Sequence, residues 1–450
     1  MSVTLRLDRL PISRVHYGIF ACAATAQFLD ALDFQIIAFV LPQLLVDWHL
    51  DVVTIGFMAS SSLSGLFIGA VFWGIMSDRI GRRRAFQATL WWFGIFTALA
   101  AFTWNPLSMA FATFFAGIGI GGEIPLSYTI LGEYMPAKNR GKIQVFSSAI
   151  WETGGFAAGL IALALMPVFS WRALFVVGAM PALVLAVLAR RYVPESIRFL
   201  IANGEMEKAA QILNSMETSA GIQPTELAST GSDIELEKRP GTRMTITGLW
   251  RNYRRRTLLT WTLYFANFIT YYGIATWLPT LLVGEGYGLV RSIAFTTGMI
   301  AAAIVGEIFA ATLIDFVGRK PLLTIFFSLA ATSIILFGVM GSSMGVAGLM
   351  LLGSLSFFFV RGTAGALHAF VNESYPTEWR VTGHGLAQAC GRVGGMLGPV
   401  VVGLVMGARG QIVYPLVLFG GLNFVGAAFM FTLGYETKGK ALEAISPSQS

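Results

Sequence analysis

Apolar runs long enough to cross a lipid bilayer recur along the whole sequence, and they restrict the possible folds more than any other feature. A hydrocarbon core of about 30 Å requires roughly 20 apolar residues in a helix, since a helix satisfies its own backbone hydrogen bonds in lipid. We count twelve such runs. The composition, with 55% hydrophobic and 12% charged residues, agrees. The sequence therefore predicts an all-α membrane protein with twelve transmembrane helices.

The predicted spans form two groups of six. They cover residues 18–45, 54–77, 85–103, 107–131, 143–166 and 172–193, and then 257–283, 290–314, 321–341, 346–370, 381–405 and 412–434. We expect a tail over 1–17, one six-helix bundle over 18–193, a second over 257–434 and a tail over 435–450. A polar linker over 194–256, which begins with an amphipathic helix, joins the bundles.

The positive charges lie mainly on one side of the predicted membrane. Of the 31 Lys and Arg residues, 26 fall in the two tails and the connections that share their side. Positive charge accumulates on the cytoplasmic side of membrane proteins. We therefore expect both termini in the cytoplasm, and the net charge of +7 then reflects topology, not a nucleic-acid partner.

The two groups of spans repeat one another in sequence. The loop DRIGRRR from Asp78 matches DFVGRKP from Asp315 at an offset of 237 residues. EYMPAKNR, with Glu133 and Arg140, matches ESYPTEWR, with Glu373 and Arg380, at an offset of 240. The chain is predicted to consist of two pseudo-symmetric halves.

Several motifs resemble those of one transporter family. GIMSDRIGRRR resembles the loop signature of the major facilitator superfamily, and PESIRFL and YETKG resemble the signatures that follow spans six and twelve in its sugar-porter-like branches. DALDF, GGEIPLSY and CGRVGGMLGP are most similar to its bacterial niacin transporters, which neighbour the aromatic acid:proton symporters. The resemblance implies the bacterial inner membrane, transport by alternating access and a central cavity between the halves.

Three residues depart from the family patterns. Ile197 and Tyr435 replace prolines of the two signatures, and Thr113 stands where many proton symporters carry an arginine. The paired glutamines that sugar transporters of this branch carry in span seven are absent from the sequence. Hexose transport is therefore the lesser interpretation.

The loop charges are predicted to lock the helices in one conformation and release them in the other. The alternative is that they are solvated charges that only set the topology. By resemblance, Glu195 and Glu436 join these networks. The gating set is Asp78, Arg82, Arg83, Glu133, Arg140, Glu195, Asp315, Arg319, Glu373, Arg380 and Glu436.

Ionisable residues inside spans are costly, at about 2.5 to 3.5 kcal/mol each, and so indicate function. Candidate proton carriers are Asp30, Asp33, Glu123 and Glu152. Asp30 and Asp33 are three residues apart on one helix face, which we expect to line the central cavity. Asp33 is the first choice for the carrier, with Asp30 tuning it or binding substrate. Alternatively, either aspartate forms a fixed ion pair with an intramembrane arginine.

The repeat also relates Glu152 in span five to Arg392 in span eleven. Arg392 is predicted to bind a substrate carboxylate, because a guanidinium group matches a carboxylate with two hydrogen bonds. Glu152 is expected to pair with Arg392 when the site is empty. Arg361 and Glu307 are expected to form a structural pair or a gate.

Aromatic and polar residues near these charges suit a flat ring. Trp151 neighbours Glu152, Tyr128 lies on span four, and Tyr271 shares a helix face with Asn267, which aligns with Asp30. Each aromatic residue alone could instead face lipid or pack in the core.

Together with these features, the resemblance implies a secondary transporter that imports a small aromatic carboxylate, nicotinate first, together with protons. The alternatives are another aromatic acid or a sugar as cargo, and a membrane sensor that binds ligand without transport. A membrane enzyme is disfavoured because the four histidines are dispersed and no nucleophile pattern occurs. We expect a monomer in membrane lipid that needs no cofactor or metal.

Overall fold

The computed structural model describes residues 6–7, 10–223, 246–341, 343–375 and 377–438, without the side chains of 137–149, 246, 377–378 and 380–381. Within these residues all regular structure is helical. The expected class, an all-α membrane protein in two six-helix halves, is confirmed.

The first half contains six long helices, each corresponding to one predicted span. They are α2 (Arg14–Asp47), α3 (Val52–Ile80), α4 (Arg82–Ala100), α5 (Pro106–Tyr134), α6 (Ala137–Leu165) and α7 (Arg172–Tyr192). Two shorter helices follow in the linker, α8 (Ile197–Ala202) and α9 (Met206–Ser219). The side of α9 that carries Ala209, Leu213 and Met216 is buried, as expected for an amphipathic helix.

The second half repeats the pattern with six more long helices. They are α10 (Ile246–Gly284), α11 (Leu289–Val317), α12 (Arg319–Met340), α13 (Gly345–Ser374), α14 (Thr377–Arg409) and α15 (Val413–Leu433). The φ/ψ angles of Tyr253 interrupt α10 between its basic first segment and its spanning part.

Nine helices in the described part of the chain are both long and apolar enough to cross a membrane. The three long helices outside this group are α4, α6 and α10. α4 begins with three arginines, and α10 begins with a basic segment. In α6 the apolar part is the shorter stretch Ile150–Leu165.

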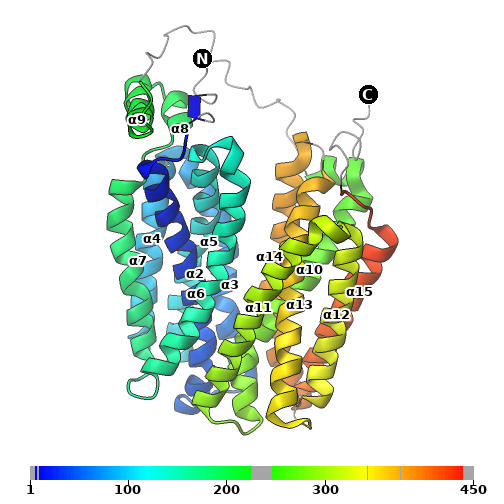
Figure 1. The fold of residues 1–450 in the computed structure, drawn as a ribbon. Helices are drawn as coiled ribbons and strands as arrows, with labels where there is room; N and C mark the ends of the chain where they lie inside the picture. Colours follow the sequence, from blue (N-terminus) through cyan, green and yellow to red (C-terminus); the bar gives the residue numbers. More distant parts are fainter. Residues whose placement is uncertain (1–5, 8–9, 224–245, 342, 376, 439–450) are drawn as a thin grey trace.

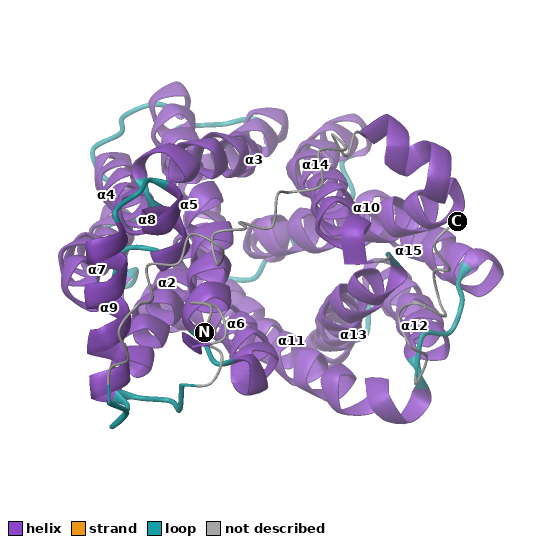
Figure 2. Cartoon of the chain, turned by 90° about the horizontal axis from the view of Figure 1, so that it is seen from above, coloured by secondary structure: helices purple, strands orange, loops and turns teal. Residues whose placement is uncertain are grey.

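The halves lie side by side, with α2–α9 in one and α10–α15 in the other (Figures 1 and 2). Their ribbons diverge toward the end that carries α8 and α9 (Figure 1). At the opposite end they pack closely, because a Cβ atom on Gly56 of α3 would lie 2.9 Å from the carbonyl oxygen of Pro399 in α14. The contact between the halves is therefore tightest at the end away from the linker helices.

Candidate functional site

A cavity of about 130 Å³ lies between the two halves. Aromatic, apolar and ionisable side chains from both halves line it. These residues are Gln27, Asp30, Phe34, Leu63, Leu66, Ile120, Ile124, Tyr128, Trp151, Phe268, Tyr272, Arg361, His368, Gln388, Arg392 and Gly395. An apolar pocket with a few polar groups is typical of small-molecule sites.

Three aromatic rings from the two halves form one wall of this cavity. The ring of Phe34 stacks on Trp151 with centroids 6.4 Å apart and planes 28° apart. Tyr272 meets Phe34 edge-on at 5.0 Å. Ring edges and faces in this arrangement can receive a flat aromatic ligand.

Arg361 is held by acids from both halves. Its guanidinium group forms an ion pair with Glu152 of α6 and a second, at 3.2 Å, with Glu307 of α11. It also lies over the ring of Tyr271, 4.8 Å from the centroid. The expected Arg361–Glu307 pair is present, and Glu152 joins it.

The expected pair between Glu152 and Arg392 is wrong, because Glu152 pairs with Arg361. Equivalence by the pseudo-two-fold gave Glu152 and Arg392 a similar depth in the membrane. It did not place them on facing sides of the cavity. α13 brings Arg361 to α6 instead.

Arg392 of α14 lines the cavity and is half-buried. Among the residues that the structure describes, no ion pair or hydrogen bond engages its guanidinium group, and Tyr272 lies nearby. Of the two arginines in the cavity, Arg392 is thus the one whose charge has no carboxylate within the described structure.

The two aspartates of α2 have different surroundings. Asp30 lines the central cavity, and its carboxyl group lies beside that of Glu123 from α5. Ser127 donates a hydrogen bond to Glu123. Asp33 accepts a hydrogen bond of 2.9 Å from Thr97 of α4 and lines a separate small cavity inside the first half.

The expectation that both aspartates line the central cavity is therefore wrong for Asp33. Three residues along a helix correspond to a rotation of about 300°, so the two side chains point about 60° apart. At this position that angle separates the central cavity from the interior of the first half.

Asn267 and Tyr271 are not among the residues that line the cavity. Asn267 donates a hydrogen bond of 2.9 Å to the carbonyl group of Val360, and Tyr271 donates one of 3.4 Å to Glu152. The next residue in each case, Phe268 and Tyr272, faces the cavity.

Of the other predicted substrate contacts, Trp151 and Tyr128 both line the cavity. Sequence reasoning missed Gln27 and Phe34. Their spacing gave a usable signal, because positions 27, 30 and 34 form one stripe along α2.

Two of the histidines that are dispersed in the sequence meet in the fold. The hydroxyl group of Tyr264 lies 2.8 Å from Nδ1 of His368 and 3.1 Å from Nε2 of His384. Gln388 donates to His384 at 2.8 Å. His368 and Gln388 line the cavity, so this cluster adjoins the site.

The loop charges of the first half form one network. Arg82 forms an ion pair with Asp78 at 2.7 Å and lies 3.9 Å from Glu133. Glu195 accepts a hydrogen bond of 3.1 Å from the backbone amide of Arg83, at the start of α4. A carboxylate at a helix N-terminus is favourable because the amides there are unpaired and carry positive partial charge.

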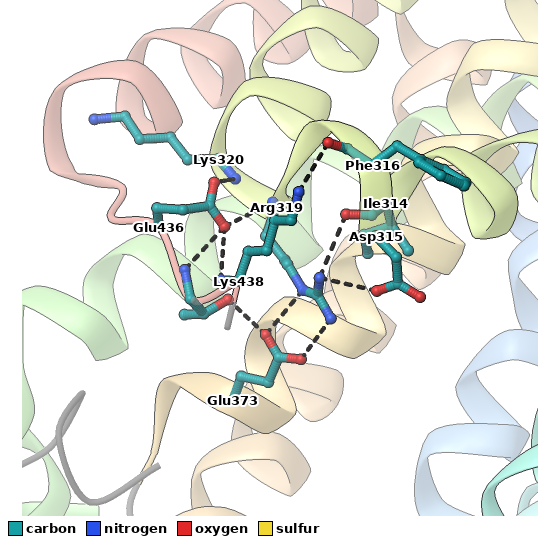
Figure 3. Close-up of polar contacts among 9 residues, drawn as sticks. Ile314, Asp315, Phe316, Arg319, Lys320, Glu373, Glu436 and Lys438 are labelled. Atoms are coloured by element: carbon teal, nitrogen blue, oxygen red, sulfur yellow. Dashed lines mark hydrogen bonds and ion pairs between the residues drawn. The ribbon is translucent and has the colours of Figure 1, made fainter. Parts of the chain in front are cut away.

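The second half repeats this network (Figure 3). Arg319 pairs with Asp315 at 3.0 Å and with Glu373 at 2.9 Å. Glu436 accepts hydrogen bonds from the amides of Arg319 and Lys320 at 2.9 and 3.1 Å. The two other predicted members, Arg140 and Arg380, have side chains outside the described residues.

Burial raises the pKa of Glu436, but the backbone amides of Lys438, Arg319, Lys320 and Thr437 outweigh this and hold the pKa below its usual range. The carboxylate is therefore charged at neutral pH. It caps α12 in the way that Glu195 caps α4.

Comparison with known proteins agrees with this architecture. The family model described as the Major Facilitator Superfamily matches residues 23–399. The chain belongs to the major facilitator superfamily. This membership places it among transporters, not enzymes.

Relatives within the major facilitator superfamily extend over nearly the whole chain. It is 34% identical to a niacin transporter of Acinetobacter baylyi, over 99% of this chain and 100% of the relative. It is 28% identical to a 4-hydroxybenzoate transporter of the same organism, over 89% of this chain and 87% of the relative.

A solved structure shares the fold. The xylose transporter XylE of E. coli, in a partially occluded inward-open conformation, superposes with a TM-score of 0.77 at 20% identity. The superposition covers 95% of this chain and 100% of XylE.

Proposed function

We propose that this protein imports a small aromatic carboxylate, with nicotinate as the first candidate, by proton-coupled symport and alternating access. The observation that carries the proposal is Arg392, a cavity arginine with no carboxylate partner in the described structure. The relatives of this protein include a niacin transporter and a 4-hydroxybenzoate transporter.

In the proposed ligand pose, the ligand contacts both the charged and the aromatic side chains of the cavity. Arg392 binds the carboxylate, and the ring lies against Phe34, Trp151 and Tyr272. Arg361 is a poorer choice for the carboxylate because Glu152 and Glu307 already neutralise it.

Asp30 and Glu123 are the proposed proton carriers. Both are buried beside one another, and neither has an ion pair with an arginine or lysine in the described residues. Two adjacent buried carboxyl groups cannot both hold a negative charge without a large cost, so the pair favours holding a proton. Asp30 also lines the substrate cavity, which allows binding of proton and substrate to be coupled.

The same cavity could take a benzoate-like acid, and the 4-hydroxybenzoate relative supports that second candidate. His368 and Gln388 add hydrogen-bonding groups to the cavity, which suit a ring nitrogen or a ring hydroxyl group. A titration with both acids ranks the two candidates.

Binding of nicotinate to Arg392→Ala and Arg392→Lys tests the proposal. The alanine variant should lose at least about 2 kcal/mol of binding free energy, or roughly 30-fold in affinity, because it removes the charged partner of a carboxylate that binding buries. The lysine variant should recover part of this loss, since it keeps the charge but not the two-point geometry. Calorimetry on the purified protein measures both.

Nicotinamide is the matched control ligand, because it has the same ring and no charge. Its affinity should differ much less between wild type and Arg392→Ala. Equal nicotinate affinity in wild type and the alanine variant would show that Arg392 does not bind the carboxylate.

A further inference from the structure

A second and larger cavity, of about 620 Å³, lies within the first half at the end that carries the linker helices. The first residues of α2 and α4, the last residues of α7, and α8 and α9 enclose it. It is separate from the central cavity, since the two share no lining residue. The transport mechanism proposed above makes no use of it.

The lining of this cavity is strongly basic. Its cationic side chains are Arg14, Arg83, Arg84, Arg190, Arg191 and Lys208. Among the described residues of the lining, the carboxylates are Glu195 and Glu205. The cavity therefore has a surplus of four positive charges.

Both carboxylates are already engaged. Glu195 accepts hydrogen bonds of 3.1 Å from the amides of Arg83 and Ser196. Glu205 pairs with Lys208 at 2.5 Å. In the described part of the chain, Nε of Arg83 is buried without a hydrogen-bond partner. Within the described residues, no ion pair neutralises the arginines of this cavity.

The fold alone does not require these charges, as the second half shows. At the repeat offset of 237, Arg84 corresponds to Pro321. At the offset of 241 that relates Glu195 to Glu436, Arg190 and Arg191 correspond to Phe431 and Thr432. The equivalent membrane-spanning helices of the second half therefore fold without three of the arginines.

Exposed apolar side chains lie on α7 next to the arginines of the cavity. Val184, Val187 and Leu188 are 56%, 59% and 43% exposed, on the last turns before Arg190. In a membrane these side chains contact lipid tails. The cavity then lies at the depth of the phosphate groups, at the end that the charge asymmetry assigns to the cytoplasm.

We propose that this basic cavity binds the phosphate group of an anionic phospholipid, with an acyl chain along α7. A lipid phosphate group and free phosphate would bind through the same chemistry, an anion held by several arginines. The adjoining apolar surface of α7 favours the lipid as the source.

Native mass spectrometry of the detergent-purified full-length protein tests this, with phosphatidylglycerol and phosphatidylcholine of the same acyl chains as probes. Phosphatidylglycerol should bind at one saturable site and phosphatidylcholine should not. Each cytoplasmic arginine contributes about a fivefold gain in affinity for an anionic lipid, so Arg84→Gln with Arg190→Gln should weaken binding roughly 25-fold.

Two control variants make the result specific. Arg254→Gln with Arg255→Gln removes the same charge from exposed positions of the second half and should leave binding unchanged. Arg84→Lys with Arg190→Lys keeps the charge and should recover most of the affinity, which separates a lost site from a misfolded protein.

Three outcomes would overturn the proposal. Equal binding of the two lipids would show that charge recognition is absent. An equal loss in the Arg254/Arg255 variant would show that the site is not this cavity. Displacement of phosphatidylglycerol by millimolar inorganic phosphate would assign the cavity to free phosphate instead of lipid.

Discussion

The two arginines of the central cavity differ in their capacity to bind a ligand carboxylate, because their surroundings differ. Arg361 links the two halves, because its guanidinium group forms ion pairs with acids of α6 and α11. Arg392 lines the same cavity without such a partner in the described structure. A buried ion pair costs several kcal/mol to break, so a ligand carboxylate should choose Arg392.

The two aspartates of α2 allow a matched test of the proton carrier. Asp30→Asn should abolish accumulation of substrate driven by a proton gradient, because an amide cannot release a proton. It should retain binding and substrate exchange, which need no net proton movement. Counterflow and gradient-driven uptake in proteoliposomes measure the two activities separately.

Asp33→Asn is the control, with the same substitution three residues along the same helix and a hydrogen bond to Thr97. It should keep gradient-driven uptake. The reverse pattern, with Asp33→Asn inactive and Asp30→Asn accumulating substrate, would return the carrier to Asp33, the residue that the sequence favours.

Residue chemistry was more predictable than residue direction. Because charge is costly in lipid, the sequence alone identifies Asp30, Glu152 and Arg392 as candidate site residues. Whether Tyr271 or Tyr272 faces the cavity depends on a rotation of about 100° about α10, which helix packing decides. The histidine cluster depends on contacts between α10, α13 and α14, which no local pattern encodes.

At the scale of elements, the two loop networks hold the ends of neighbouring helices together. Each links a spanning helix to the next through an arginine and places a glutamate on the N-terminal amides of that next helix. The turn that permits this contains a glycine with positive φ, 97° at Gly81 and 96° at Gly318. The repeated motifs predicted a charge network at this place in both halves, and the resemblance added Glu195 and Glu436 to it. The backbone amides with which these two glutamates form hydrogen bonds were not predicted.

Gly81→Ala should destabilise the protein, whereas Gly74→Ala should not. A Cβ atom on Gly81 would lie 2.6 Å from Oε2 of Glu195, and the backbone conformation of Gly81, with φ 97° and ψ 155°, alone costs a residue with a side chain about 1 to 3 kcal/mol. Gly74 lies inside α3, where a Cβ atom would have no other atom within 4 Å, so alanine there should be neutral or stabilising by up to about 1 kcal/mol.

Thermal unfolding of both variants in the same detergent checks this. The melting temperature of Gly81→Ala should fall, and that of Gly74→Ala should stay level or rise. Equal melting temperatures in the two variants would show that neither the positive φ of Gly81 nor the nearby Glu195 restricts the side chain at this position.

For the whole molecule, the sequence predicts the architecture well because two signals, the length of the apolar runs and the internal repeat, can be read directly along the chain. Apolar length defines the spans, and the 237-residue repeat, visible at Asp78 and Asp315, divides them into halves. The contacts between the halves are another matter. The pairing of Glu152 with Arg361, instead of Arg392, depends on how the two bundles face each other.

Uptake of labelled nicotinate by wild-type protein in proteoliposomes, with and without an imposed inward proton gradient, tests the central claim most directly. Proton-coupled symport predicts accumulation above the external concentration with the gradient, and only equilibration without it. Binding without uptake would identify a sensor, and equal uptake under both conditions would contradict proton coupling.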